Sequence, residues 1–157
     1  MALVESTLKA GVLTVTLNDE KRRNALSSDL LIELVDILDG ADVDDAVRVI
    51  ILTNAGSVFC AGANLSEQTS GIRPGRTIEM ASVFARFARS PKPYVGRIAG
   101  HCVAGGMGLA AAMDLSVAVD DATFGFTEVR VGVAPAMISV LCLPKLRAGD
   151  ARAAILR

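Results

Sequence analysis

The sequence predicts a mixed α/β fold in which pairs of strands alternate with helices. Residues 12–17 (VLTVTL) alternate in side-chain character, which is typical of a strand with one covered face. Residues 30–38 place leucine and valine at helical spacing. Residues 47–53 (VRVIILT) are nearly all apolar and β-branched, as expected of a strand covered on both faces. Together these segments indicate one α/β domain over residues 1–157, which is long enough to bury a single core.

The first three elements are predicted from turn and capping residues. Residues 3–8 and 12–17 are expected to pair as a hairpin around residues 9–11 (KAG). Ser27 or Ser28 can cap the following helix, and Gly40 suits its end. The loop before that helix is polar and basic. It is interpreted as a solvated loop, or alternatively as a group of cations that meets phosphates.

The middle of the chain alternates loops with regular elements. Residues 54–65 form a loop of small residues after the strand 47–53, where α/β proteins place ligand sites. Its AGA run at 61–63 is either a tight turn or a close approach between backbone and ligand. Residues 66–75 are predicted to be a polar loop or lid. Residues 76–89 predict a helix whose apolar stripe is assigned to core packing, with no role toward a cofactor.

The last part of the chain predicts short strands around a glycine-rich segment. A strand over 94–98 leads into glycines at 100, 105, 106 and 108, which precede a predicted helix over 109–113. A strand over 115–119 and a strand-like segment over 124–131 follow, and then a helix from about residue 138. Residues 148–157 begin a helical pattern that has no cap, so we expect the chain to stop inside an element.

Two features of this last part point to chemistry. Glycines before a helix let a polar group of a ligand approach bare backbone N–H groups at the positive end of the helix. Glu128 stands among apolar neighbours in the sequence, so burial would raise its pKa and allow it to move protons near neutral pH. We therefore expect an anion-stabilising glycine turn that works with one proton-shuttling glutamate. The alternative is a surface acid, or an ion pair with Arg130.

Composition excludes several other classes of function. Hydrophobic content of 52% and charged content of 21% are typical of a globular protein, and a net charge of -1 argues against nucleic-acid binding. No stretch approaches the ~20 apolar residues of a membrane span. The N-terminus lacks the pattern of a signal peptide, so a cytoplasmic setting is expected.

Metal and nucleotide sites are also not expected. Cys60, Cys102 and Cys142 are too far apart for a metal set, and His101 has no evident partner ligand. Structural thiols are the favoured interpretation, with a catalytic Cys–His pair as a weaker alternative. Residues 106–111 fit the pattern G-x-G-x-x-A, but the next strand ends too early for the acid of a dinucleotide site.

Three blocks together carry a family resemblance. Residues 57–65 (SVFCAGANL), 100–114 (GHCVAGGMGLAAAMD) and 124–135 (FGFTEVRVGVAP) resemble the enoyl-CoA hydratase/isomerase, or crotonase, family. Residues 19–27 (DEKRRNALS) resemble its first CoA-contacting loop. The resemblance implies a spiral of repeated β-β-α units that binds an acyl-CoA thioester. It also implies that the C-terminal helical part, about a hundred residues that close the acyl pocket and build a homotrimer or hexamer, is lacking.

The resemblance also implies roles for individual residues. The backbone N–H groups of Ala63 and Gly105 would hold the thioester oxygen as it becomes an enolate, and Glu128 would transfer the proton. No separate cofactor is implied, because CoA is part of the substrate. The implied CoA contacts come from both loops: Arg22, Arg23, Ala25, Ala61, Ala63, Asn64 and Leu65.

Two positions depart from the family pattern. Gly108 stands where family hydratases commonly carry a first glutamate, and Asn64 stands where an aspartate is common. The run E-V-x-x-G-x-x-P-A-x-I-S over 128–139 resembles a hydratase branch, which favours addition of water to a 2-enoyl-CoA. The alternatives are an isomerase that uses Glu128 alone and a non-catalytic subunit that binds acyl-CoA.

Overall fold

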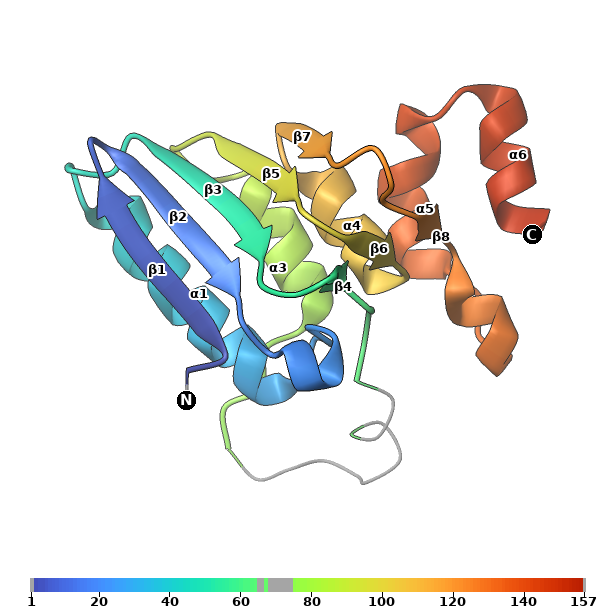
Figure 1. Cartoon of the computed structure of the whole chain (residues 1–157), viewed down its shortest axis with the longest axis horizontal. Helices are drawn as coiled ribbons and strands as arrows, with labels where there is room; N and C mark the ends of the chain where they lie inside the picture. The colour runs from blue at the N-terminus through green and yellow to red at the C-terminus, as the bar shows by residue number, and fades with distance from the viewer. Residues whose placement is uncertain (1, 65–66, 68–74, 157) are drawn as a thin grey trace.

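The computed structural model describes residues 2–64, 67 and 75–156 and contains two sheets flanked by helices (Figure 1). The larger sheet has the order β1-β2-β3-β5-β7, and the smaller one has the order β4-β6-β8. The larger sheet consists of β1 (Val4–Lys9), β2 (Val12–Leu17), β3 (Val49–Asn54), β5 (Tyr94–Ile98) and β7 (Leu115–Ala118). The smaller sheet consists of β4 (Val58–Cys60), β6 (His101–Val103) and β8 (Phe124–Gly125).

The chain winds through three successive β-β-α units. β1 and β2 form the predicted antiparallel hairpin, whose turn residues Ala10 and Gly11 both have positive φ. All other strand pairs in both sheets are parallel, so each step requires a crossover. In each unit one strand joins the larger sheet, the next joins the smaller sheet, and a helix returns the chain: α3 (Met80–Phe87), α4 (Gly105–Ala112) and α5 (Ala136–Cys142).

The first helix, α1 (Ser28–Val43), begins as predicted but ends later. The Ser27 hydroxyl accepts a hydrogen bond from the N–H of Leu30 at 3.2 Å, as a helix cap does. The predicted end at Gly40 is wrong. The helix continues because Ala41 is buried against the core, and because the Lys92 ammonium donates to the carbonyls of Ala41 and Asp44.

The apolar stripe of the second predicted helix is confirmed. Val83, Phe84 and Phe87 on α3 are all buried in the core, although α3 is shorter than the predicted helix over 76–89. The predicted loop or lid over 66–75 lies outside the described residues, apart from Glu67 and Gly75, and stays a prediction.

The glycine-rich segment differs from the prediction. The predicted loop over 54–65 contains β4, and α4 begins at Gly105 rather than at 109, so three glycines lie within the helix. Glycine allows this helix to approach β4 closely, since a Cβ at Gly106 would lie 2.5 Å from the carbonyl oxygen of Cys60. β6 precedes α4 and was also not predicted.

The C-terminal part contains more short helices than predicted. Only Phe124–Gly125 of the strand-like segment is a strand, and it is followed by the 3₁₀ helix η2 (Thr127–Val131), which ends at Gly132 with φ of 74°. α5 begins two residues before the predicted position. A second 3₁₀ helix, η3 (Leu143–Lys145), and α6 (Ala148–Leu156) complete the chain. In the described part of the chain, no helix is long and apolar enough to cross a membrane.

Asn24 fixes the loop between β2 and α1. Its side chain is buried, and its own φ of 51° is one that asparagine tolerates. The side-chain oxygen accepts from the N–H of Asp19 at 2.8 Å. The side-chain nitrogen donates to the carbonyls of Ala55 and Val58, at 3.1 and 2.8 Å. One side chain therefore ties this loop, which includes the 3₁₀ helix η1 (Glu20–Arg22), to the segment around β4.

Replacing Asn24 with alanine is expected to lower the free energy of unfolding by about 3 kcal/mol, because buried backbone groups lose their partners. The measurement is urea denaturation at equilibrium. Asn18→Ala is the matched control, since the side chain of Asn18 forms hydrogen bonds at the surface. A loss below ~1 kcal/mol in Asn24→Ala would contradict this role.

Candidate active site

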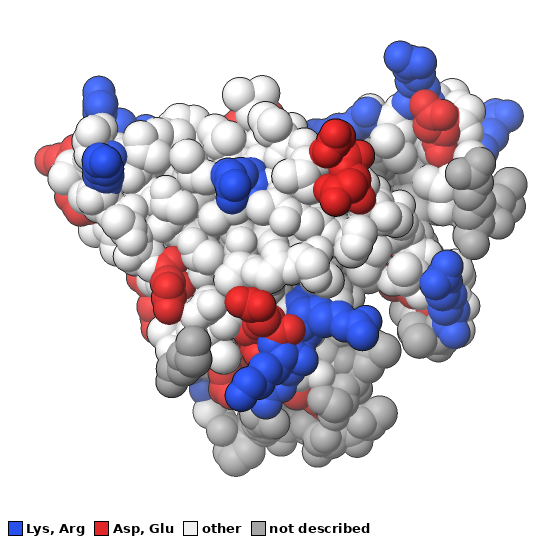
Figure 2. Space-filling model, in the orientation of Figure 1, with Lys and Arg blue, Asp and Glu red and all other residues white. Residues whose placement is uncertain are grey.

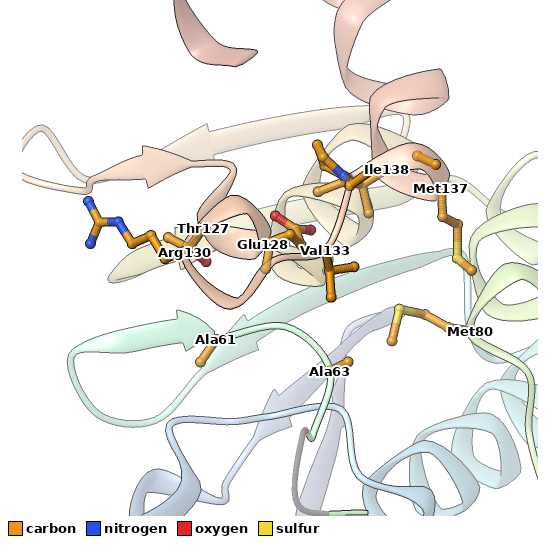
Figure 3. Close-up of a pocket in the computed structure, with 14 residues that line it drawn as sticks. Ala61, Ala63, Met80, Thr127, Glu128, Arg130, Val133, Met137 and Ile138 are labelled. Atoms are coloured by element: carbon orange, nitrogen blue, oxygen red, sulfur yellow. The ribbon is translucent and has the colours of Figure 1, made fainter. Parts of the chain in front are cut away.

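A cavity of about 550 Å³ opens where the three β-β-α units meet. In Figure 3, Ala61 and Ala63 form one wall, Glu128, Val133 and Ile138 stand opposite, and Met80 and Met137 lie at one end. These residues come from the loop after β4, from η2, from α5 and its approach, and from α3. Ala104 and Gly105, at the start of α4, complete the wall that contains Ala63.

The N–H of Ala63 points away from the neighbouring chain segment. The carbonyl of Gly62 accepts a hydrogen bond from the N–H of Leu26 at 2.8 Å. The peptide between Gly62 and Ala63 is trans, so its N–H and C=O point in opposite directions. The N–H of Ala63 therefore points away from residues 22–26, and Ala63 itself lines the cavity.

The N–H of Gly105 is a second donor on the same wall. Gly105 is the first residue of α4, so its N–H has no acceptor within the helix and lies at the positive end of the helix dipole. Ala104 before it has φ of 50° and ψ of −129°, a strained conformation that turns the chain from β6 into α4. Strain of this kind is often retained at functional sites.

Gly62 allows the two donors to come together. Its φ is +89°, and a Cβ at this position would lie 2.5 Å from the Cβ of Ala104 and 2.9 Å from the nitrogen of Gly105. The loop after β4 is therefore packed directly on the start of α4. The structure thus brings Ala63 and Gly105, which are far apart in the sequence, to one side of the cavity.

Glu128 is the acidic residue that lines the cavity. It is half-buried on η2, and its Oε2 atom is buried and has no hydrogen-bond partner among the residues that the structure describes. Burial raises the pKa of Glu128, and a backbone hydrogen bond only partly opposes this. The alternative of an ion pair between Glu128 and Arg130 is wrong. Among the described residues the two side chains form no ion pair, and the Arg130 guanidinium points away from Glu128 (Figure 3).

The loop that was expected to contact CoA lies beside this wall. The carbonyl of Arg23 accepts from the N–H of Ala61 at 3.1 Å, so residues 22–26 run alongside residues 61–63. Arg22 pairs with the buried Asp19 at 3.3 Å while its own side chain stays 62% exposed, and Arg23 is exposed. Figure 2 shows lysine and arginine side chains gathered over this loop.

Three other residues that were expected to contact CoA differ from these exposed arginines. Ala25 is buried. The side chain of Asn64 donates to Glu67 at 3.1 Å. Leu65 lies outside the described residues.

Most of the cavity lining could not be predicted from the sequence. Met80 was assigned to core packing alone, yet it also lines the cavity, because one edge of the apolar stripe of α3 reaches it. Val133, Pro135, Met137 and Ile138 had no assigned role and form the apolar wall beside Glu128. Apolar residues that line a cavity have the same spacing in the sequence as apolar residues of a core, so the spacing does not distinguish the two.

Gly108 has no room for a side chain. A Cβ at this position would lie 2.7 Å from Cζ of Phe84 and 2.8 Å from Cγ2 of Ile138. Both neighbours are buried. The place where the family resemblance put a first glutamate is therefore filled by apolar side chains from α3 and α5.

The cysteines are buried and free, as expected for structural thiols. Burial raises the pKa of Cys60 to about 12 and that of Cys142 to about 11, and it raises the pKa of Cys102 further. His101 is exposed and accepts a hydrogen bond from the N–H of Thr123. Among the described residues, no group of three or more His, Cys, Asp or Glu could hold a metal ion.

Comparisons with known proteins agree with this architecture. The family model for enoyl-CoA hydratase/isomerase matches residues 7–156. A curated homologue from Thermus thermophilus, named as an enoyl-CoA hydratase, is 38% identical over 139 residues, which cover 85% of this chain and 55% of the homologue. A hydroxycinnamoyl-CoA hydratase-lyase from Pseudomonas fluorescens is 31% identical over 84% of this chain and 51% of its own.

Solved structures share the fold. An enoyl-CoA hydratase from Mycobacterium avium matches with a TM-score of 0.85 and 39% identity, over 99% of this chain and 62% of that one. An enoyl-CoA hydratase from Bacillus anthracis matches with a TM-score of 0.85 and 30% identity, over 98% of this chain and 62% of that one. The chain spans between about half and two thirds of the length of these four relatives. The predicted crotonase-like fold is confirmed, and the chain belongs to the enoyl-CoA hydratase/isomerase family.

Proposed function

We propose that this chain forms the catalytic core of an enoyl-CoA hydratase, which adds water across the double bond of a 2-enoyl-CoA thioester. The observation that supports the proposal is the placement of Ala63, Gly105 and Glu128 around one cavity. Ala63 and Gly105, whose N–H groups would be the donors, line the cavity together, and Glu128, whose pKa is raised by burial, stands opposite Ala63 (Figure 3).

The two N–H groups would stabilise the negative charge that develops on the thioester oxygen. Addition of an oxygen nucleophile at the β carbon moves an electron pair through the double bond onto that oxygen, which gives an enolate. Backbone dipoles that are already in place stabilise this charge without reorganising. The basic loop around Arg22 and Arg23 would hold the phosphates of CoA outside the cavity.

Glu128 would act twice in one turnover. As a carboxylate it takes a proton from water while the water oxygen bonds to the β carbon. As a carboxylic acid it then gives that proton to the α carbon, and the enolate returns to the thioester. The balance is one water added and no net proton exchanged, so one residue with a raised pKa suffices.

Isomerisation of the double bond is the second candidate, and the closed position at Gly108 favours it. An isomerase needs one base that removes a proton from one carbon of the acyl chain and returns it to another. Phe84 and Ile138 leave no place for a second acid on α4, so Glu128 would serve this reaction too.

The oligomer that the family implies belongs to the same proposal. Leu115 and Val117 on the edge strand β7 are each 67% exposed. Apolar side chains so exposed on one strand support burial against other subunits in a homotrimer or hexamer.

The test of hydration follows the absorbance of the conjugated thioester when the protein is mixed with crotonyl-CoA and with branched 2-enoyl-CoAs. Loss of absorbance with formation of the 3-hydroxyacyl product supports the hydratase. Conversion of 3-enoyl-CoA to 2-enoyl-CoA, without hydration, supports the isomerase instead. Binding of acyl-CoA without either reaction would contradict both and support a non-catalytic subunit.

The pH dependence of kcat/KM is expected to show an acid limb above 4.5, the ordinary pKa of glutamate. Burial raises the pKa of Glu128, and only the ionised form can accept a proton from water, so the rate rises with pH through the raised pKa. The measurement is kcat/KM with crotonyl-CoA across the acid and neutral range. An acid limb at or below the ordinary value would contradict the assignment.

A further inference from the structure

Ile138 holds an unusual place in the cavity. It lines the cavity from the first half of α5, yet it is only 3% exposed. The opposite side of its side chain packs against α4 at Gly108, where a Cβ would lie 2.8 Å from Cγ2 of Ile138. The side chain therefore separates the cavity from the glycine surface of α4.

Phe84 closes the same gap from α3. Its ring atom Cζ would lie 2.7 Å from a Cβ at Gly108, and Phe84 is 4% exposed. Three elements thus meet behind Ile138 without space between them. Shortening Ile138 would open a recess that is continuous with the cavity and floored by Gly108 and Phe84.

The rest of the wall beside Ile138 is also apolar. Met80, Val133, Pro135 and Met137 line it. Arg130 also lines the cavity, but its guanidinium points away from Ile138 (Figure 3). An acyl group with a second charge would lose its hydration here without gaining a partner of opposite charge.

We infer that Ile138, backed by Phe84 over Gly108, determines how bulky an acyl group the cavity accepts, and that the accepted acyl groups are uncharged hydrocarbons. This inference rests on the proposed function only in placing the acyl group of a CoA thioester in the cavity. In this arrangement the side chain that fills the place of a second acid also sets the width of the acyl site.

The experiment measures binding of saturated acyl-CoAs by titration calorimetry, so it does not depend on turnover. The first pair of probes is 3-methylbutanoyl-CoA and 3,3-dimethylbutanoyl-CoA, which differ by one methyl group. Wild type is expected to bind the smaller probe more tightly. Ile138→Ala is expected to shift the ratio of the two Kd values about tenfold toward the bulkier probe, as one methyl-sized group in an apolar pocket does.

Two further variants test the role of Ile138. Ile138→Val is a smaller change that preserves the core, and it is expected to shift the ratio in the same direction by less. Val140→Ala is the matched control, because Val140 lies on the same helix and is 72% exposed. Its Kd ratio is expected to equal that of wild type.

A second pair of probes tests the charge preference. Pentanoyl-CoA is expected to bind at least tenfold more tightly than glutaryl-CoA, which carries a terminal carboxylate. Equal binding of this pair would overturn the hydrocarbon preference. An unchanged ratio for the first pair in both Ile138 variants, or an equal shift in Val140→Ala, would overturn the role of Ile138.

Failure of the inference and failure of the proposed function give different results. Shifted Kd ratios without turnover of any enoyl-CoA would support the acyl site and contradict the enzyme. Turnover with unshifted ratios would contradict the inference alone. Absence of binding by every acyl-CoA would overturn both.

Discussion

Replacing Glu128 with glutamine is expected to lower kcat for 2-enoyl-CoA by about 10²–10⁴-fold, the usual contribution of a general acid–base. Glutamine keeps the shape of the side chain but neither accepts nor delivers the proton. Affinity for a saturated acyl-CoA is expected to stay near that of wild type, because the two N–H groups and the basic loop are unchanged. Steady-state kinetics and calorimetry measure the two effects separately.

The folded state of the Glu128→Gln variant provides the control. Burial raises the pKa of Glu128 in the folded protein, so the folded state holds this proton more tightly than the unfolded state. The free energy of unfolding of wild type therefore falls as pH rises from the ordinary pKa through the raised one, and glutamine removes this loss. Glu79→Gln, at an exposed acid, is the matched variant and should leave kcat unchanged. A kcat within tenfold of wild type in Glu128→Gln would contradict the role of Glu128.

Replacing Gly62 with alanine is expected to lower kcat by about 10²–10³-fold, the effect of losing one donor to a developing oxyanion. The added methyl group would overlap the Cβ of Ala104 and press on the nitrogen of Gly105, and alanine is strained at φ of +89°. Both effects move the N–H of Ala63 relative to that of Gly105. Because the loss occurs in the transition state, kcat should fall more than the affinity for acyl-CoA.

Gly40→Ala is the matched control for this substitution. Gly40 is exposed on α1, and no atom of the described residues lies within 4 Å of a Cβ there, so alanine should leave kcat unchanged and slightly stabilise the helix. Gly62→Ala is also expected to reduce stability. Its kcat is therefore calculated per folded molecule, with the folded fraction measured by circular dichroism. An unchanged kcat in folded Gly62→Ala would argue that the two donors do not act together.

The sequence predicted those elements whose signal is local. The strand over 12–17, the cap at Ser27 and the buried stripe of α3 all follow from side-chain patterns within a few residues. The raised pKa of Glu128 followed from its apolar sequence neighbours combined with burial. The family resemblance supplied the pairing of Ala63 with Gly105, which no local pattern contains.

The features that were missed depend on distant contacts. β4 and β6 are each three residues long, and they exist because they pair with each other. α1 continues past Gly40 because Lys92, about fifty residues later, binds its last carbonyls. The role of Asn24 appears only when the loop before α1 lies against β4.

A crystal structure with a bound saturated acyl-CoA would test the proposed site most directly. We expect the thioester oxygen to lie about 2.7–3.1 Å from the backbone nitrogens of both Ala63 and Gly105, with the carboxyl group of Glu128 beside the α and β carbons. A thioester oxygen that contacts neither nitrogen, or an acyl chain outside the cavity that Glu128 lines, would contradict it.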